Sequence, residues 1–407
     1  MTTIALHPPL ARRLSPRAGF WAVAFSFLAL TAFSTAPSAL YGLYEQREQL
    51  SPLTLTVVYA VYSVGVIASL LLAGHVSDLY GRRRVLIPSL VLAAVAALVF
   101  IVWTSLAALL VARVLTGVAL GAAVATATAY IADLDAGPDG SVSRRAGIVA
   151  TAANIGGLAI GPLLAGLLAE YAAGGLTLPY VALLAALLIG ALAVALSPEG
   201  REPVRPRPSY RPQRLRAPAG TRSQFLAAST GGFLVFTVGG LFAGLAGAFL
   251  AGPLHHPSPA LTGVAILLNF GTGVFVQTTT TRWPTSKLIR AGLPLMIIGL
   301  VVLVASAWTT PASLALFLIG GAVVGTGGGA ILRASLTVVI STTTAADRAG
   351  ALTTFFTAAY VGLALPVLGL GVAFQVLSPR VTLLAFGAIV GLGILAAAPL
   401  LLRSDTE

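Results

Sequence analysis

Twelve long apolar runs constrain this chain more than any other feature of its sequence. Each run holds about 20 residues or more, the length of an α-helix that crosses the hydrocarbon core of a bilayer. With 57% hydrophobic and only 9% charged residues, the chain could not cover the surface of a water-soluble domain. We therefore expect an all-α membrane protein with twelve transmembrane helices. The expected spans cover residues of about 18–44, 53–77, 85–103, 105–132, 145–172, 176–197, 224–251, 259–281, 289–308, 312–341, 348–377 and 379–402.

The positive charge of the chain follows the topology of these spans. The formal net charge is +12, which in a soluble protein would suggest a nucleic-acid partner. Once the spans are assigned, 20 of the 24 Lys and Arg residues fall in segments on one side, and basic loops face the cytoplasm. We expect a multi-pass protein of the plasma (inner) membrane, with both termini cytoplasmic and no nucleic-acid partner.

The first apolar run is expected to stay in the protein as a helix. Residues 1–17 contain Arg12, Arg13 and Arg17 before that run, as a signal peptide would. The run is too long for a signal peptide, however, and no convincing cleavage site follows it.

A basic, proline-rich segment divides the chain into two similar halves. Residues 197–223 contain seven arginines and six prolines, which disfavour both a regular helix and a packed core. We expect a cytoplasmic linker between six-helix bundles at residues 1–196 and 224–407. Internal repetition supports this division, because Arg145-Ala146-Gly147 and Arg348-Ala349-Gly350 open corresponding helices. Two such halves imply a pseudo-twofold axis and a binding site between them near the midplane.

The short turn between the second and third spans carries the most specific motif. Residues Gly74, Asp78, Gly81, Arg82 and Arg83 lie there in a fixed order. They resemble the G-x-x-x-D-R-x-G-R-R signature of the major facilitator superfamily, whose members are transporters with two pseudo-symmetric six-helix bundles. The departure from this signature is Leu79, where the family usually has arginine.

The resemblance implies that this turn is a conformational latch. In the family, the acid at the position of Asp78 contacts the start of the eleventh helix, where the helix dipole favours a negative charge. Arg82 or Arg83 is implied to pair with acids that end the fourth and sixth helices, here Asp133 and Glu199. The alternative for the arginines is ordinary anchoring on the cytoplasmic side.

The fourth span places an arginine and two glycines on one face. Arg113, Gly117 and Gly121 are spaced by four residues, so all three share a side of the helix. The small residues allow close helix packing, and the arginine is costly unless it faces protein or water. The pattern resembles the family's R-x-x-x-G-x-x-x-G motif, whose arginine is linked to proton transfer. The alternative is an arginine that only hydrogen-bonds main-chain carbonyls.

The fifth span favours export over import. Gly157, Gly161, Pro162 and Gly166 resemble the G-x-x-x-G-P-x-x-G-G motif of proton-driven antiporters, with Ala165 in place of one glycine. Glycines let helices touch, and the proline removes one backbone donor. Small residues with proline are also common in membrane helices of other kinds.

Acidic residues leave proton coupling open. All twelve acids fall at the ends of spans or between them, so no carboxylate is expected at the midplane. Coupling would use Arg113 with a peripheral acid such as Asp133, or the substrate's own proton; uncoupled facilitation is the alternative. The chain has no cysteine and four scattered histidines, so we expect no metal site and no cofactor.

Polar and aromatic residues within the spans are candidates for the substrate site, although each alone is as well explained by packing. Arg333 lies close enough to the inner end of its helix to reach the interface. Two arginines facing a cavity without acids would favour an acidic or neutral substrate over a cationic one. The candidates are Tyr59, Tyr62, Arg113, Asn154, Asn269, Arg333, Phe355 and Tyr360.

These patterns together predict a secondary active transporter. We expect a monomer in the lipid bilayer that works by alternating access and exports small amphipathic compounds such as antibiotics, with protons as coupling ions. A facilitator or symporter of an organic anion is the alternative. An enzyme is not expected, because the spans contain no cluster of nucleophiles, acids or metal ligands.

Overall fold

The computed structural model describes residues 14–74, 76–103, 105–136, 143–200, 212–218, 220–344 and 347–403. The described residues form fourteen helices and no strand. Twelve segments are long and apolar enough to cross a membrane, with α1 and α2 counted as one. The helices are α1 Pro16–Thr35, α2 Pro37–Glu48, α3 Pro52–Ala73, α4 Val76–Tyr80, α5 Arg82–Val102, α6 Leu106–Leu134, α7 Arg144–Tyr171, α8 Thr177–Leu196, α9 Arg222–Ala251, α10 Pro259–Thr279, α11 Thr285–Trp308, α12 Leu314–Ser341, α13 Arg348–Val376 and α14 Pro379–Arg403. The predicted basic stretch up to residue 13, and residues 201–211 and 219 of the predicted linker, lie outside the described part.

Local sequence accounts for where many of these helices begin. Serine side chains accept a hydrogen bond from a first-turn N–H at the start of six spans, which satisfies one of the otherwise unpaired donors there. These capping serines are Ser15, Ser51, Ser105, Ser143, Ser258 and Ser313. Proline follows the cap directly at Pro16, Pro52 and Pro259, where its missing N–H costs nothing.

Two predicted spans differ from the observed helices. The first span is divided at Ala36, because Pro37 has no N–H and begins the separate helix α2. The second span ends at Ala73, and Asp78 lies in the separate short helix α4 rather than at the end of the span. Predicted and observed ends of the other spans differ by a few residues.

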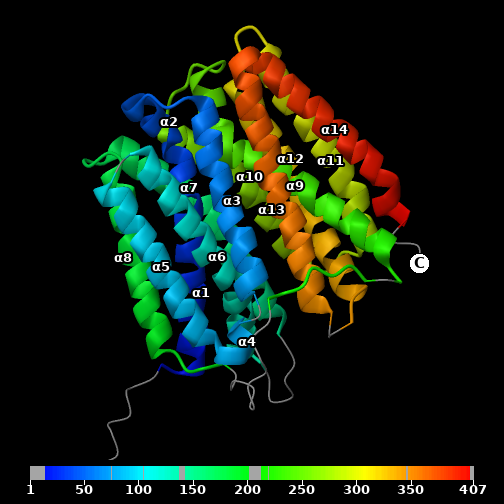
Figure 1. The fold of residues 1–407 in the computed structure, drawn as a ribbon. Coiled ribbons are helices and arrows are strands. Elements are labelled where there is room, and N and C mark those ends of the chain that lie inside the picture. Colours follow the sequence, from blue (N-terminus) through cyan, green and yellow to red (C-terminus); the bar gives the residue numbers. More distant parts are fainter. Residues whose placement is uncertain are drawn as a thin grey trace, which may run out of the picture.

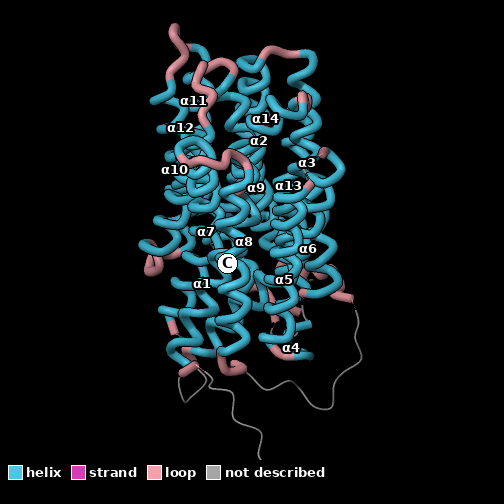
Figure 2. The backbone as a smooth tube through the Cα atoms, turned by 90° about the vertical axis from the view of Figure 1, so that its left-hand side faces the viewer, coloured by secondary structure: helices cyan, strands magenta, loops and turns pink. Residues whose placement is uncertain are grey.

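The helices form two groups that lie side by side (Figure 1). In the first group α6 packs on α3 and α5, and α1 packs on α7 and α8; in the second α12 packs on α9, α10 and α11. The groups meet where α7 packs on α10 and α3 packs on α13. The long helices run roughly parallel to one axis of the molecule (Figure 2).

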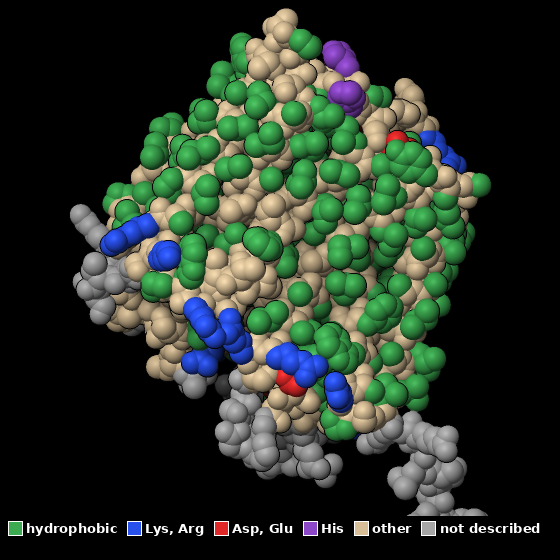
Figure 3. All heavy atoms as spheres, turned by 180° about the vertical axis from the view of Figure 1, so that it is seen from behind, with side chains coloured by type: hydrophobic (Ala, Val, Ile, Leu, Met, Phe, Trp, Pro, Cys, Tyr) green, Lys and Arg blue, Asp and Glu red, His purple; other side chains and the backbone are tan. Residues whose placement is uncertain are grey.

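The molecule has two ends that differ in their loops and charges. The linker end holds α4 and residues 212–218, and the far end holds the turn at residues 252–258 (Figure 1). Between them the surface is apolar, with many exposed leucine, valine and isoleucine side chains. The face in Figure 3 shows these side chains over most of its height, with Lys and Arg side chains gathered toward the linker end and histidines at the far end. This distribution suits a protein surrounded by lipid.

Candidate functional site

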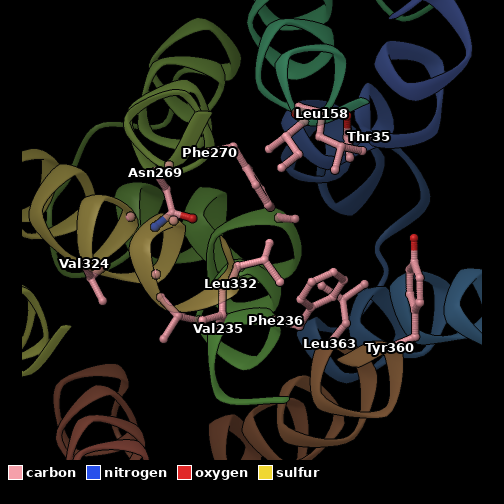
Figure 4. A pocket seen from close by; sticks show the side chains of 18 of the residues that line it. Thr35, Leu158, Val235, Phe236, Asn269, Phe270, Val324, Leu332, Tyr360 and Leu363 are labelled. Carbon is pink, nitrogen blue, oxygen red and sulfur yellow. Dashed lines mark hydrogen bonds between the residues drawn. The ribbon is translucent and has the colours of Figure 1, made fainter. Parts of the chain in front are cut away.

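A cavity lies between the two groups of helices. Its walls come from α1, α3, α6 and α7 on one side and from α9 to α13 on the other. Its empty volume is about 820 Å³, which includes the space where the cavity opens to the outside. Figure 4 shows apolar side chains from both groups, among them Leu158, Phe236, Phe270 and Leu332, pointing toward a common space. The apolar lining suits a small organic molecule.

Close main-chain contacts between the groups seal the far end of this cavity. A methyl group added at Gly166 of α7 would lie 2.6 Å from the carbonyl carbon of Pro259, and one added at Gly263 of α10 would lie 2.6 Å from the Cα of Leu163. On the other side of the interface, a Cβ at Gly371 of α13 would lie 3.0 Å from the Cβ of Thr56. Only glycine allows these approaches.

Polar contacts reinforce the seal at the far end. The carboxylate of Glu170, near the end of α7, accepts hydrogen bonds from the hydroxyl of Ser258 at 2.5 Å and from the N–H of Ala260 at 2.9 Å. Both donors belong to the start of α10 in the second group. The pairing puts a negative charge at the N-terminus of a helix, which the helix dipole favours.

The two groups are bridged differently at the linker end. Residues 212–218 pass between α3 and α13: the N–H of Gln213 donates to the carbonyl of Leu71 at 2.8 Å, and the main chain of Arg216 exchanges hydrogen bonds with the hydroxyl of Thr354 at 2.9 and 3.1 Å. Arg216 also pairs with Asp347. This segment thus bridges α3 and α13, and its two contact points, three residues apart, are at most about 10 Å from each other. In Figure 1, α8 and α14 diverge toward this end.

Arg113 is the buried charge of the cavity wall. Its residue is 1% exposed, and its guanidinium donates to the carbonyl of Ser34 at 2.6 Å. The guanidinium carbon lies 4.3 Å from the centre of the Tyr62 ring and 5.8 Å from that of Tyr59. No carboxylate of the described residues lies within ion-pair distance of it.

Glycines on α6 bring Arg113 to this position. A Cβ at Gly117 would lie 3.0 Å from the Cα of Gly65, and one at Gly121 would lie 2.7 Å from the carbonyl of Val66. The predicted face of the fourth span therefore packs directly on the backbone of α3. The arginine on the same face is then held over the tyrosines of α3.

The glycines predicted in the fifth span serve two different contacts. Gly157 and Gly161 face α1 within the same group, where an added Cβ would lie 2.7 Å from the carbonyl of Leu28 and 2.6 Å from the carbonyl carbon of Ala32. Gly166 faces α10 in the other group. Pro162 lies inside α7 between these contacts, and its carbonyl is close to Gly263 of α10.

The predicted latch residues lie together at the linker end, away from the cavity. Arg82 pairs with Asp78 at 2.5 Å and with Asp133 at 3.1 Å. The N–H of Arg83 donates to Glu199 at 3.1 Å, and its guanidinium donates to the carbonyl of Ala195 at 3.1 Å. These contacts join the ends of α4, α5, α6 and α8 within one group.

Glycines complete this corner. Gly81 has φ of 101°, a conformation that glycine adopts without strain, and Gly74 ends α3. The carboxylate of Asp78 pairs with Arg82. The predicted contact of Asp78 with the start of α13 is not formed in the described part of the chain, and residues 212–218 lie against the first turns of that helix instead. The latch contact with that helix stays a prediction for another conformation.

The substrate candidates divide between the cavity and its surroundings. Tyr59, Tyr62, Arg113, Asn269 and Tyr360 line the cavity. The rings of Tyr62 and Tyr360, from different groups, lie 6.3 Å apart, and the amide of Asn269 donates to the carbonyl of Gly321 at 3.2 Å.

The remaining candidates do not belong to the lining found for this cavity. Phe355 is fully buried and packs against Gly232. Arg333 donates to the carbonyls of Gln277 at 2.6 Å and Thr281 at 3.0 Å, which favours the packing alternative for it. Asn154 is half-buried in α7 and lies outside the lining.

Sequence reasoning missed most of the apolar wall and two polar residues, Thr35 and Gln277. Phe236, Phe270 and Leu332 line the cavity, but apolar residues in apolar spans carry no signal that separates them from lipid-facing ones. Gln277 also lines it. Its rarity as an amide within a span could have drawn attention to it.

No carboxylate of the described residues lines the cavity. Asp133 is engaged by Arg82 at the linker end, and Glu170 is engaged at the far end. The acids Asp139, Glu202, Asp405 and Glu407 lie outside the described residues.

Comparisons with known proteins identify a family that matches most of the chain and relatives of about a third of it. The sequence profile of the Major Facilitator Superfamily matches residues 18–312. A bacillibactin exporter of Bacillus subtilis (strain 168) is 33% identical over 132 residues, which are 31% of this chain and 33% of that protein. An uncharacterized transporter of Buchnera aphidicola is 29% identical over 132 residues, 32% of each chain. The match thus spans about a third of the length of each curated relative.

Solved structures resemble the chain over nearly its full length. A peptide transporter has a TM-score of 0.75 at 13% identity, covering 95% of each chain. The human organic anion transporter MFSD10 has a TM-score of 0.65 at 17% identity, covering 96% of this chain and 100% of that one. The nucleoside transporter NupG has a TM-score of 0.69 at 11% identity, covering 94% and 99%. At these identities the likeness concerns the fold.

Proposed function

Because the chain belongs to the major facilitator superfamily, we propose that it is a secondary transporter that exports small amphipathic molecules by alternating access. The linker end faces the cytoplasm in this proposal, as do both termini, and the protein works as a monomer in the plasma membrane. The two groups of helices act as the rocking bundles, joined by the linker at residues 197–223.

The observation that carries the proposal is the apolar cavity between the groups. Its lining comes from both groups, so any motion of one group against the other changes access to it. The far end is sealed by helix backbones in direct contact at Gly166 and Gly263, and by the side chain of Thr56 against Gly371. In this proposal, the described conformation offers the cavity to molecules on the linker side. A transporter also needs the converse state, in which these three contacts separate.

The contacts of α7 support alternating access, and one relative and the cavity lining support its use for export. The helix that carries Gly157, Gly161, Pro162 and Gly166 contacts its own group and the opposite group on different faces, so a bend at the proline would move one set of contacts relative to the other. A relative of part of the chain is named an exporter. The apolar lining suits substrates that partition into the membrane from the cytoplasmic side.

Proton coupling is the second part of the proposal, with Arg113 and Asp133 as its candidates. Arg113 contacts the cavity, whereas Asp133 is paired with Arg82 at the linker end. Proton uptake by Asp133 would weaken that pair and so favour release of the corner around α4. The alternative is a facilitator or symporter of an organic anion, which the absence of a described carboxylate in the lining favours.

Transport by purified protein in liposomes tests the proposal. Neutral, anionic and cationic amphiphiles are supplied in turn with and without a proton gradient, while internal pH and substrate are recorded. Substrate-dependent proton movement in the opposite direction is the expected result. Equilibration that ignores the gradient would indicate the facilitator, and transport of no member of the panel would contradict the proposed substrate class.

A further inference from the structure

We propose that Arg113, with the hydroxyl groups around it, forms a subsite for the carboxylate of an amphipathic organic anion. The proposal rests on the function proposed above and names the substrate class of the same cavity. The charged group of the substrate would lie beside Arg113, and its apolar body would extend along Phe236, Phe270 and Leu332.

The charge of Arg113 has no counter-ion among the described residues. A guanidinium stays protonated in proteins, so this side chain is a permanent positive charge within a membrane-spanning helix. The residue is 1% exposed, and its guanidinium donates one hydrogen bond, to the carbonyl of Ser34. The faces of Tyr59 and Tyr62 compensate it partly. Burying a charge that lacks a counter-ion is costly, so a bound anion would be favoured here.

Arg113 itself and two residues of α2 supply unused donors. The Nε of Arg113 is buried without a partner. On α2, one and two turns after Ser34, the hydroxyls of Ser38 and Tyr41 are also buried without partners, and both residues are at most 5% exposed. They lie behind the lining of the cavity rather than in it, and Tyr41 is close enough to Arg113 to interact with its charge. Each of these three groups can donate a hydrogen bond. A site that holds unused hydrogen-bond donors and an uncompensated positive charge would bind a ligand group that is negatively charged and accepts hydrogen bonds.

The break between α1 and α2 explains why these groups lie here. Pro37 interrupts the helix at Ala36, which leaves carbonyls near the break available to side-chain donors. Ser34 accepts from Arg113 before the break, and Ser38 and Tyr41 follow it. A carboxylate offers two oxygens that accept several hydrogen bonds, and its contacts with arginine are among the stronger ones in proteins.

The cavity gives such an anion a matching body site. Arg113, Tyr59 and Tyr62 lie in the same lining as Phe236, Phe270 and Leu332. Tyr62 and Tyr360 meet across the two groups beside the charge. A ligand held at Arg113 would therefore contact both groups of helices at once.

Binding of a matched pair of probes tests the subsite. Purified protein in nanodiscs is dialysed to equilibrium against 2-naphthoate or 2-naphthamide, which share a ring system and differ in charge at pH 7. Wild-type protein should bind the naphthoate more tightly by at least about tenfold, which is about 1.4 kcal/mol. Arg113→Met should remove that preference while naphthamide binding stays unchanged.

Two milder variants keep the test valid if Arg113→Met fails to fold. Arg113→Lys keeps the charge and should retain part of the preference. Tyr41→Phe removes one unused donor and should weaken naphthoate binding without affecting naphthamide. Wild-type protein that binds naphthoate no better than naphthamide, including protein that binds neither, overturns the subsite. Variants that lower binding of both probes equally overturn it as well.

The result is separable from the proposed function. If the liposome panel shows transport of neutral or cationic amphiphiles by a protein without naphthoate preference, the subsite is wrong and the transporter stands. If naphthoate binds with the expected preference but no member of the panel is transported, the subsite stands and the proposed function fails.

Discussion

Replacing Gly166 with alanine should shift the protein toward the state in which the far end is open. The added methyl group would lie 2.6 Å from the carbonyl carbon of Pro259 and 3.0 Å from the Cα of Ala260. Both are backbone atoms of the opposite group, so α7 and α10 would have to separate by several tenths of an ångström or more. The clash exists only while the far end is sealed.

The expected magnitude follows from the cost of overpacking. An extra methyl group in a tight contact costs about 1–3 kcal/mol. If that cost applies to one conformation and not to the other, the ratio of the populations of the two conformations changes by about 5- to 150-fold. Alanine also favours helix over glycine by about 1 kcal/mol, but this gain applies to both conformations and cancels.

Distances between spin labels measure the shift. The chain has no native cysteine, so labels can be placed on cysteines at the exposed positions Gln46 and Ser378, near the far end in different groups. Gly166→Ala should enrich the longer distances. The matched control is Gly156→Ala on the same helix, where nothing lies within 4 Å of an added Cβ.

A second control separates conformational bias from loss of stability. Gly161→Ala creates a similar clash, 2.6 Å from the carbonyl carbon of Ala32, but within one group. It should lower thermal stability without changing the distance distribution. If Gly166→Ala gives the same distribution as Gly156→Ala, the assignment of this contact to one conformation is wrong.

Three further predictions concern the linker end. Asp78→Asn should favour the state open to that end by removing the latch acid, seen as faster labelling of a cysteine at the cavity residue Gln277; an unchanged rate would remove the latch role. Arg82→Ala leaves Asp133 without its partner and should lower the free energy of unfolding by about 1.5–3 kcal/mol, measured by chemical denaturation. Asp347→Asn, which breaks an exposed ion pair, should cost less than about 1 kcal/mol in the same experiment, and an equal loss in both variants would contradict the difference in burial.

Helix number and type could be predicted from sequence because each span must satisfy a length and a hydropathy requirement of its own. The break at Pro37 was predictable in principle from the missing N–H, yet the apolar run continues across it and hides the end of α1. The four-residue spacing of Gly117 and Gly121 predicted that they share one closely packed face, although it did not identify α3 as the partner helix. The opposite faces of Gly161 and Gly166 did not, because spacing alone cannot say which neighbour each face meets.

The candidate site was predictable in its charged and aromatic members and not in its shape. Arg113, Tyr59 and Tyr62 stand out as polar residues within spans, and the structure brings them together. Arg333 stands out for the same reason, but it donates to the end of α10. Its neighbours are set by the approach of α10 to its own helix α12, and α10 is far from it in sequence. The unused donors of Ser38 and Tyr41 depend on packing in the same way.

The central claim is that the far end must open for transport, and a reversible cross-link tests it most directly. Thr56 and Gly371 face each other across the two groups, with 3.0 Å between the Cβ of Thr56 and a Cβ built at Gly371; a disulfide needs about 3.5–4.5 Å. The double variant Thr56→Cys with Gly371→Cys is oxidised in liposomes, and each single variant reports the effect of its own substitution. The account predicts that oxidation stops transport in the double variant and that a reductant restores it. Full transport by protein shown to be cross-linked would contradict alternating access through this end.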